Sequence, residues 1–205
     1  PYGKAQEGWN LVGNPYLADI NITKHQNVIF DEHKVTKFVY QYNKELDNYI
    51  TFDMTNYDEE QKIIPFQSYF VQTLAPEAEL TVTPVAKEVT LNRRTFDYYT
   101  ANEYTSVRLK LYAEDKEQDR TDIIWEEGAS ADFVVNEDAP KFWSLSATAN
   151  QLFSAAGESA ASVNTLPMDT EEVKLGLRIG TPGKLSLRLS RITGFTGDDE
   201  VILWD

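Results

Sequence analysis

The sequence predicts an all-β protein with antiparallel sheets, and three observations carry this prediction. Apolar and polar residues alternate with a period of two in several segments of the 205-residue chain, which is typical of strands that bury one face. The 3.6-residue period of an amphipathic helix does not persist beyond about ten residues. Turn-forming residues, such as the Thr-Pro-Gly at 181–183, separate the alternating segments. We therefore expect sheets with one face in water.

The chain opens with a strand that ends at a turn. Residues 8–22 read GWNLVGNPYLADINI, an extended segment interrupted by Gly-Asn-Pro. Alternation places Trp9 and Leu11 on one face of the strand and the polar Asn10 on the other. We expect Trp9 to anchor the core of the first domain.

Two further strand segments follow in the first half of the sequence. Residues 36–53 predict a hairpin, because β-branched and aromatic residues flank a turn rich in Asn, Lys and Asp. Phe38, Tyr40 and Tyr42 share one face of its first strand, which favours a core position for Tyr40. Residues 62–72 predict another strand, with a proline near its start.

A proline-containing segment divides the chain. Residues 75–89 hold a short strand among prolines, and we place a domain boundary between about residues 84 and 103. The predicted domains are residues 1–88 and 89–205. Length alone allows one large all-β domain or two of roughly 100 residues each, both able to bury a core.

The second half carries the clearest alternation. Residues 107–112 predict a strand, residues 173–190 predict a hairpin around the Thr-Pro-Gly turn, and residues 200–205 predict a last strand. Residues 139–148 form the only helix-like segment, and it is too short and too rich in β-forming residues to predict a helix.

Composition excludes several classes of partner and site. The 33 acidic and 19 basic residues give a formal charge of -14, which disfavours binding to nucleic acid and to anionic lipid. With no cysteine, the chain has no disulfide, thiolate metal site or cysteine nucleophile. No apolar run reaches the 18 or so residues that a membrane-spanning helix needs. The chain begins at Pro1, and we expect it to be a piece of a longer protein.

Few residues suggest catalysis. His25 and His33 are the only histidines, their spacing is not that of a metalloprotease helix, and no Gly-x-Ser-x-Gly elbow accompanies them. Acidic pairs could in principle serve a glycosidase, but acidic runs on an acidic protein are usually solvated loops. We expect the protein not to be an enzyme and to need no cofactor.

Two weaker kinds of site remain open. Asp198, Asp199 and Glu200 crowd carboxylates into one loop, where they could bind calcium or could simply keep a hairpin tip soluble. The tyrosines of the first half could form a sugar-binding platform or could fill a small core. The candidate platform residues are Tyr40, Tyr42, Tyr49 and Tyr57.

The order of short motifs resembles one family of modules. GWNLVGNPY, followed later by IIPFQSYFVQT, is similar to a pattern in large secreted and surface proteins of Bacteroidetes. There the modules precede a C-terminal sorting domain of the type IX secretion kind. In the second half, DFVVNEDAPKFWSLSATANQLFS, SVNTLP, VKLGLRIGTPGKLSLRL and VILWD continue the resemblance. The resemblance implies two tandem β-sandwich domains, jelly-roll or Ig-like, in an exported protein.

In the resembling family, Asp132, Asp138 and Lys141 lie around a bend between strands. There an aspartate can accept hydrogen bonds from backbone amides and a lysine can pair with a carboxylate. We expect structural roles for all three.

The sequence supports two hypotheses about function. The first is a non-catalytic structural or adhesive module pair, located outside the cell or on the bacterial cell surface, whose partner would be a glycan or a surface protein. The second is a carbohydrate-binding accessory module of a polysaccharide-degrading enzyme. An exposed row of aromatic rings would favour the second.

Overall fold

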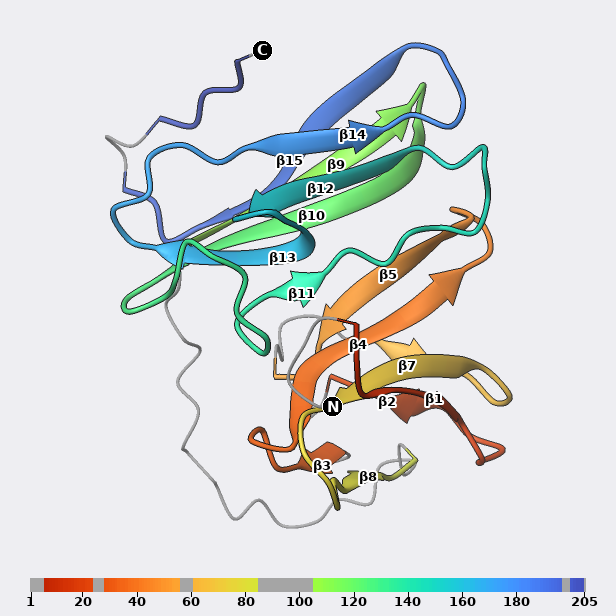
Figure 1. Ribbon diagram of the computed structural model, residues 1–205. Helices are drawn as coiled ribbons and strands as arrows, with labels where there is room; N and C mark the ends of the chain where they lie inside the picture. The colour runs from red at the N-terminus through yellow and green to blue at the C-terminus, as the bar shows by residue number, and fades with distance from the viewer. Residues whose placement is uncertain (1–5, 24–27, 56–60, 85–104, 197–199, 205) are drawn as a thin grey trace.

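The computed structural model describes residues 6–23, 28–55, 61–84, 105–196 and 200–204. All regular elements in these ranges are strands, which confirms the all-β prediction. The described part also contains no helix long and apolar enough to cross a membrane. We call residues 6–84 the first half and residues 105–204 the second half, and Figure 1 shows the two halves stacked.

The first half is built around a four-stranded antiparallel sheet with the order β1-β7-β4-β5. Its strands are β1 (Trp9–Gly13), β7 (Ser68–Thr73), β4 (Val35–Asn43) and β5 (Asn48–Asp53). Two short pairs cover one of its faces. They are β2 (Ile20–Asn21) with β6 (Lys62–Ile63), and β3 (Val28–Phe30) with β8 (Leu80–Val82).

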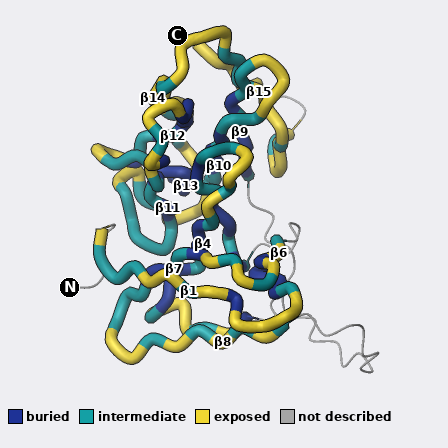
Figure 2. The backbone as a smooth tube through the Cα atoms, turned by 90° about the vertical axis from the view of Figure 1, so that its right-hand side faces the viewer, coloured by how far each residue is buried: buried dark blue, intermediate teal, exposed yellow. Residues whose placement is uncertain are grey.

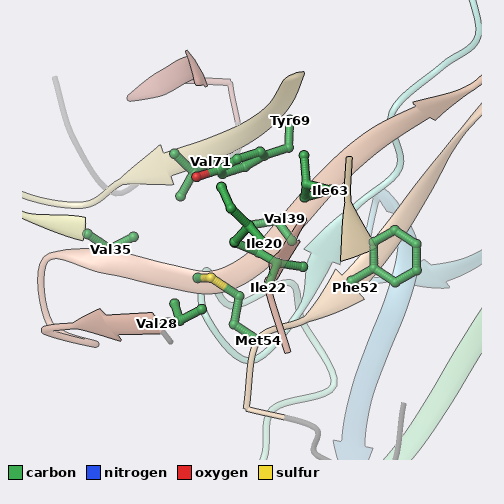
Figure 3. Packing of buried hydrophobic residues seen from close by; sticks show 10 residues of the cluster. All are labelled: Ile20, Ile22, Val28, Val35, Val39, Phe52, Met54, Ile63, Tyr69 and Val71. Atoms are coloured by element: carbon green, nitrogen blue, oxygen red, sulfur yellow. The ribbon is translucent and has the colours of Figure 1, made fainter. Parts of the chain in front are cut away.

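A hydrophobic core lies between the four-stranded sheet and these short pairs (Figure 3). The sheet contributes Val39 and Val71, which are opposite each other in register, and the short pairs contribute Ile20, Ile63 and Val28. Burying such aliphatic side chains stabilises a fold by roughly 1.5–3 kcal/mol each. This core holds the two layers of the first half together.

The second half is one seven-stranded sheet with the order β14-β12-β13-β10-β9-β15, to which β11 adds through β13. Its strands are β9 (Thr105–Ala113), β10 (Lys116–Glu126), β11 (Ala139–Pro140), β12 (Gln151–Ala156), β13 (Ser159–Pro167), β14 (Leu175–Arg178) and β15 (Leu185–Thr193).

Strand β13 joins two layers of this sheet. Its first residues pair antiparallel with β12, whereas Val163–Pro167 pair in parallel with β10. Because β13 serves both partners, the sheet folds over and β12 lies against β10 without pairing with it. Leu152 of β12 and Leu111 of β9, both buried, fill the space enclosed in this way.

Several predicted strands agree with the structure. The hairpin at 36–53 is β4 paired with β5, and the strand at 107–112 lies within β9. The predicted strand at 62–72 is divided into β6 and β7. Phe66 has a positive φ of 66°, and the amide of Gln67 donates to the carbonyl of Ile64 across a tight turn.

The predicted hairpin at 173–190 is wrong in its pairing. Strands β14 and β15 form, but β14 pairs with β12 and β15 pairs with β9. The side chain of Asn150 accepts hydrogen bonds from the amides of Gly180 and Thr181, both at 3.0 Å. These bonds hold the connecting turn against the loop before β12, so the turn crosses between layers instead of closing a hairpin.

The predicted strand at 200–205 is also absent from the structure over its described part. Residues 200–204 form no strand, and their side chains are exposed. The predicted domain boundary falls mostly on residues 85–104, which lie outside the described residues, so the division into residues 1–88 and 89–205 stays a prediction.

Gly8 gives a first testable prediction. It has a φ of 77°, and a Cβ there would lie 2.1 Å from the carbonyl oxygen of Thr73. Gly128 has a similar φ of 82°, but nothing lies within 4 Å of its Cβ position. A positive φ alone costs alanine roughly 1–2 kcal/mol, so we expect Gly128→Ala to lower the free energy of unfolding by about that amount. Gly8→Ala should lower the free energy of unfolding by clearly more than Gly128→Ala, because the added Cβ also displaces the end of β7.

Urea unfolding of both variants measures this difference. If both variants lost the same free energy of unfolding, the close approach of Gly8 to β7 would make no contribution to the cost of the Gly8→Ala substitution.

Candidate functional site between the two halves

The most developed constellation of side chains lies where the two halves meet. The four-stranded sheet turns its second face, away from the core of Figure 3, towards the second half. Phe142 of the second half inserts among aromatic rings of this face. We call the set the aromatic seam, and its members are Trp9, Tyr40, Tyr49, Phe70 and Phe142.

The rings of the aromatic seam are in direct contact. The Phe142 and Tyr40 rings stack with centroids 4.2 Å apart, and the Trp9 ring meets Phe142 edge-on at 4.5 Å. Tyr49 and Phe70 also meet Phe142 edge-on, at 5.4 and 5.7 Å. Such pairs contribute about 0.5–1.5 kcal/mol each beyond the area that they bury. Phe142 is therefore the central contact between the halves.

Hydrogen bonds surround the aromatic seam. The Tyr40 hydroxyl donates to the carbonyl of Pro140 at 3.0 Å, and the hydroxyls of Thr51 and Ser162 lie 2.8 Å apart in a buried position. The Gln151 amide donates to the Asn48 side chain at 2.9 Å. Each of these bonds joins the first half to the second.

Trp9 belongs to this interface and not to the core of the first half. Alternation places Trp9 and Leu11 on the same face, but at Trp9 this face contacts Phe142 of the second half, whereas Leu11 is 62% exposed. The expectation that Trp9 anchors the first core is thus wrong, because the sheet has apolar residues on both faces.

The four candidate platform tyrosines are dispersed. Tyr40 is fully buried in the aromatic seam, where desolvation raises its pKa well above the ordinary value. Tyr49 is half-buried beside it. Among the described members of the set, Tyr42 is the most exposed, with 42% of its surface in contact with solvent. Tyr57 lies outside the described residues.

A second partly exposed ring belongs to a segment that is hydrogen-bonded to the turn after Tyr42. The Tyr42 hydroxyl donates to the carboxylate of Asp47, which raises the pKa of Tyr42. The backbone of Asp47 accepts a hydrogen bond from Ser144, next to Trp143, whose side chain is 40% exposed. The guanidinium of Arg178 lies 5.6 Å from the centre of the Trp143 ring. Sequence reasoning missed Trp143, because it lies in a segment without alternation.

A shallow groove of about 350 Å³ opens beside the first half, between β1 and β8. Its lining includes Val12, Tyr16, Tyr69, Val71 and Leu80. The Tyr69 side chain is buried, its hydroxyl makes no hydrogen bond within the described part of the chain, and desolvation raises its pKa to about 12. The groove is thus mainly apolar, and Tyr69 is among its lining residues.

Charged groups in the second half are used for structural bonds. The ammonium of Lys141 lies 2.5 Å from the carboxylate of Asp119, and both side chains are buried. Burial lowers the pKa of Lys141, although Asp119 opposes this shift. Asp119 also accepts hydrogen bonds from the amides of Leu152 and Arg120, both at 2.8 Å. The expected pairing of Lys141 with a carboxylate is confirmed.

Asp138 has the role expected of an aspartate at a bend. Its carboxylate accepts hydrogen bonds from the amides of Val134 and Thr165, both at 2.7 Å. Burial raises its pKa to about 6 despite these two bonds. Asp132 is exposed, at the surface of the same segment.

The candidate calcium ligands cannot be placed together. Asp198 and Asp199 lie outside the described residues, and Glu200 is exposed. Within the ranges that the structure describes, no group of three or more acidic or histidine side chains could hold a metal ion. His25 lies outside the described residues, and the backbone amide of His33 donates to the side chain of Asp31.

Comparison of the chain with protein families, curated proteins and solved structures found no match.

The two buried tyrosines of the first half give a matched test. Tyr40→Phe removes the hydroxyl that bonds the second half, so we expect the free energy of unfolding to fall by about 1–2 kcal/mol. Tyr69→Phe removes a hydroxyl that has no hydrogen bond in the described structure, and its effect on the free energy of unfolding should be close to zero or slightly stabilising. Urea unfolding measures both, and a larger loss for Tyr69→Phe would contradict the assignment.

Two lysines give a second matched test. Lys141→Met leaves the charge of Asp119 buried without its partner, which typically costs about 3–5 kcal/mol. Lys110 pairs with Glu117 at 2.7 Å in a partly exposed position, so Lys110→Met should cost less than about 1 kcal/mol. Thermal unfolding at neutral pH compares the stability of the two variants. Similar losses of stability would refute the structural importance of the buried pair of Lys141 and Asp119.

Proposed function

We propose that this chain is a non-catalytic structural or adhesive module pair of a bacterial secreted or cell-surface protein. The pair consists of two tandem β-sandwich domains, jelly-roll or Ig-like, that act as a stalk, spacer or adhesin region. The observation that carries the proposal is the aromatic seam with its surrounding hydrogen bonds. A spacer has to keep its parts in a fixed relation, and an interface of stacked rings and buried polar pairs supplies this property.

The use of the charged groups supports the same proposal. A catalytic acid or base has to reach a substrate. Asp119 and Lys141 bond each other in a buried position, and Asp138 is occupied by backbone amides. Arg108 and Asp122 form a further buried pair, with nitrogen to oxygen distances of 2.6 and 2.8 Å. These groups stabilise bends and strand contacts.

A carbohydrate-binding module is the second candidate, and one observation favours it. Tyr42 and Trp143 are both partly exposed, and Asp47 joins their two segments, because it accepts hydrogen bonds from the Tyr42 hydroxyl and from Ser144, the residue after Trp143. Exposed aromatic rings next to a carboxylate are suited to stacking on sugars and to bonding their hydroxyls. Under this hypothesis, the glycan would bind at the corner formed by the β4–β5 turn and the segment after β11.

A glycan array and hydrolysis assays separate these functions. We expect no turnover of ester or glycoside substrates, and no glycan binding above that of the Tyr42→Ala/Trp143→Ala double variant. Glycan binding that the double variant loses would favour the carbohydrate-binding module. Turnover that disappears on substitution of a single carboxylate would overturn the non-catalytic proposal.

A further inference from the structure

One side of the first half carries no charge, although a quarter of the residues of the chain are charged. The segments 8–18 and 63–76 contain no acidic, basic or histidine residue. They are neighbours in the fold, because every residue of β1 has a partner on β7. Figure 2 looks onto this side and shows β1 and the turn after it as largely exposed. We call the exposed surface of these two segments the uncharged face.

Large apolar side chains are exposed at two adjacent turns of the uncharged face. Leu17 is 86% exposed in the turn after β1, and Phe66 is 84% exposed in the turn before β7. The buried Asn14 joins these turns, because its backbone amide donates to the carbonyl of Gln67 and its side-chain amide donates to the carbonyl of Ile63. We call Leu17 and Phe66 the apolar tip. Their turns are fixed to each other, so the two residues form one projection.

The turn that carries Phe66 is built at a steric cost. The amide of Gln67 donates to the carbonyl of Ile64 at 3.1 Å across Pro65 and Phe66, and the φ of Phe66 is 66°. Glycine or asparagine is usual at the third position of such a turn, because other residues adopt a positive φ only with strain. The Phe66 ring gains little packing within the chain, since it is mostly exposed. Strain of this kind points to a role of the ring at the surface.

A hollow of matching chemistry lies beside the apolar tip. The groove of about 350 Å³ between β1 and β8 is lined by uncharged residues, among them Val12, Tyr16, Val71 and Leu80. Tyr16 directly precedes Leu17, so the groove and the apolar tip belong to one surface. The volume is at the lower end of the roughly 300–1,000 Å³ of pockets for small ligands, which leaves room for a ring or a branched aliphatic side chain.

The charge of the chain favours one kind of partner for this face. Each copy has a formal charge of -14, so two copies repel each other wherever their acidic surfaces would meet. Contact through the uncharged face keeps that repulsion small and removes no ion from water. The face also has both a projection and a hollow, which gives it the self-complementarity that a two-fold interface between identical chains requires.

We propose that the uncharged face is a dimer interface, and that its occupant is the same face of a second copy of this chain. The two copies are related by a two-fold axis, and the apolar tip of each enters the groove of the other. Because both copies use the same surface, association stops at the dimer. Removal of the exposed apolar area from water supplies the driving force.

Sedimentation velocity of the full chain over a concentration series tests this interface, and we expect a reversible equilibrium between monomer and dimer. The double variant Leu17→Ser/Phe66→Asn should raise the dissociation constant about tenfold or more. Asparagine tolerates a positive φ, so the thermal unfolding midpoint of the diluted, monomeric variant should not fall. The control Leu145→Ser/Leu203→Ser replaces two leucines of the second half that are 90% and 64% exposed, and it should leave the dissociation constant unchanged.

Salt gives a second measurement with a sign of its own. Raising the ionic strength from about 0.01 to 0.15 M shortens the Debye length from about 30 to about 8 Å. Screening then reduces the repulsion between the two acidic copies, so the dissociation constant of the dimer should fall. A contact between opposite charges would instead weaken as salt is added.

Three results would overturn the proposal. The first is a chain that stays monomeric over the whole concentration series. If this monomer bound vesicles of neutral phosphatidylcholine and the double variant did not, a lipid surface would be the occupant instead. The second is a dimer that the double variant keeps or that the control variant loses equally. The third is a dimer that weakens as salt is added.

Discussion

The need to cover both faces of the four-stranded sheet is the constraint on which the rest of the structure depends. Val39 and Tyr40 are neighbours on β4, and both are fully buried, although they project from opposite faces. The short strand pairs of the first half cover the Val39 side. The Tyr40 side is covered by Phe142, Ala139 and Val163 of the second half. A first half without the second would expose aromatic rings to water, so the two halves stabilise each other.

A short segment of the second half connects this interface to the buried charges. Asp138 bonds two backbone amides, Ala139 and Pro140 form β11, Lys141 pairs with Asp119, and Phe142 enters the aromatic seam. Successive residues of an extended chain project to opposite sides. Lys141 can therefore point into the second half while its neighbours face the first. The buried ion pair holds the segment in the position that Phe142 needs.

Patterns in the sequence predicted the fold class and the strands whose apolar residues alternate, such as β4, β5 and β9. Strand β12 was not predicted, because QLFSAA has small and polar residues at positions buried by their neighbours in the folded sheet. Strand β10 was missed because KEQDRTDIIWE contains charged residues such as Asp119, whose burial depends on partners distant in sequence, Lys141 and the amide of Leu152. Which face of a strand meets which partner is decided by contacts remote in sequence. For this reason the face of Trp9 could be predicted but not its neighbours.

The polar contacts between the halves explain how one arrangement is selected. Aromatic rings can pack in several ways at similar cost, so the aromatic seam alone would tolerate sliding of one half over the other. The buried pairs Thr51 with Ser162 and Asn48 with Gln151 add little net stability. A displaced arrangement would, however, leave these polar groups buried without partners, at a cost of about 1–3 kcal/mol each. Stacking therefore supplies the attraction between the halves, and the polar pairs fix their orientation.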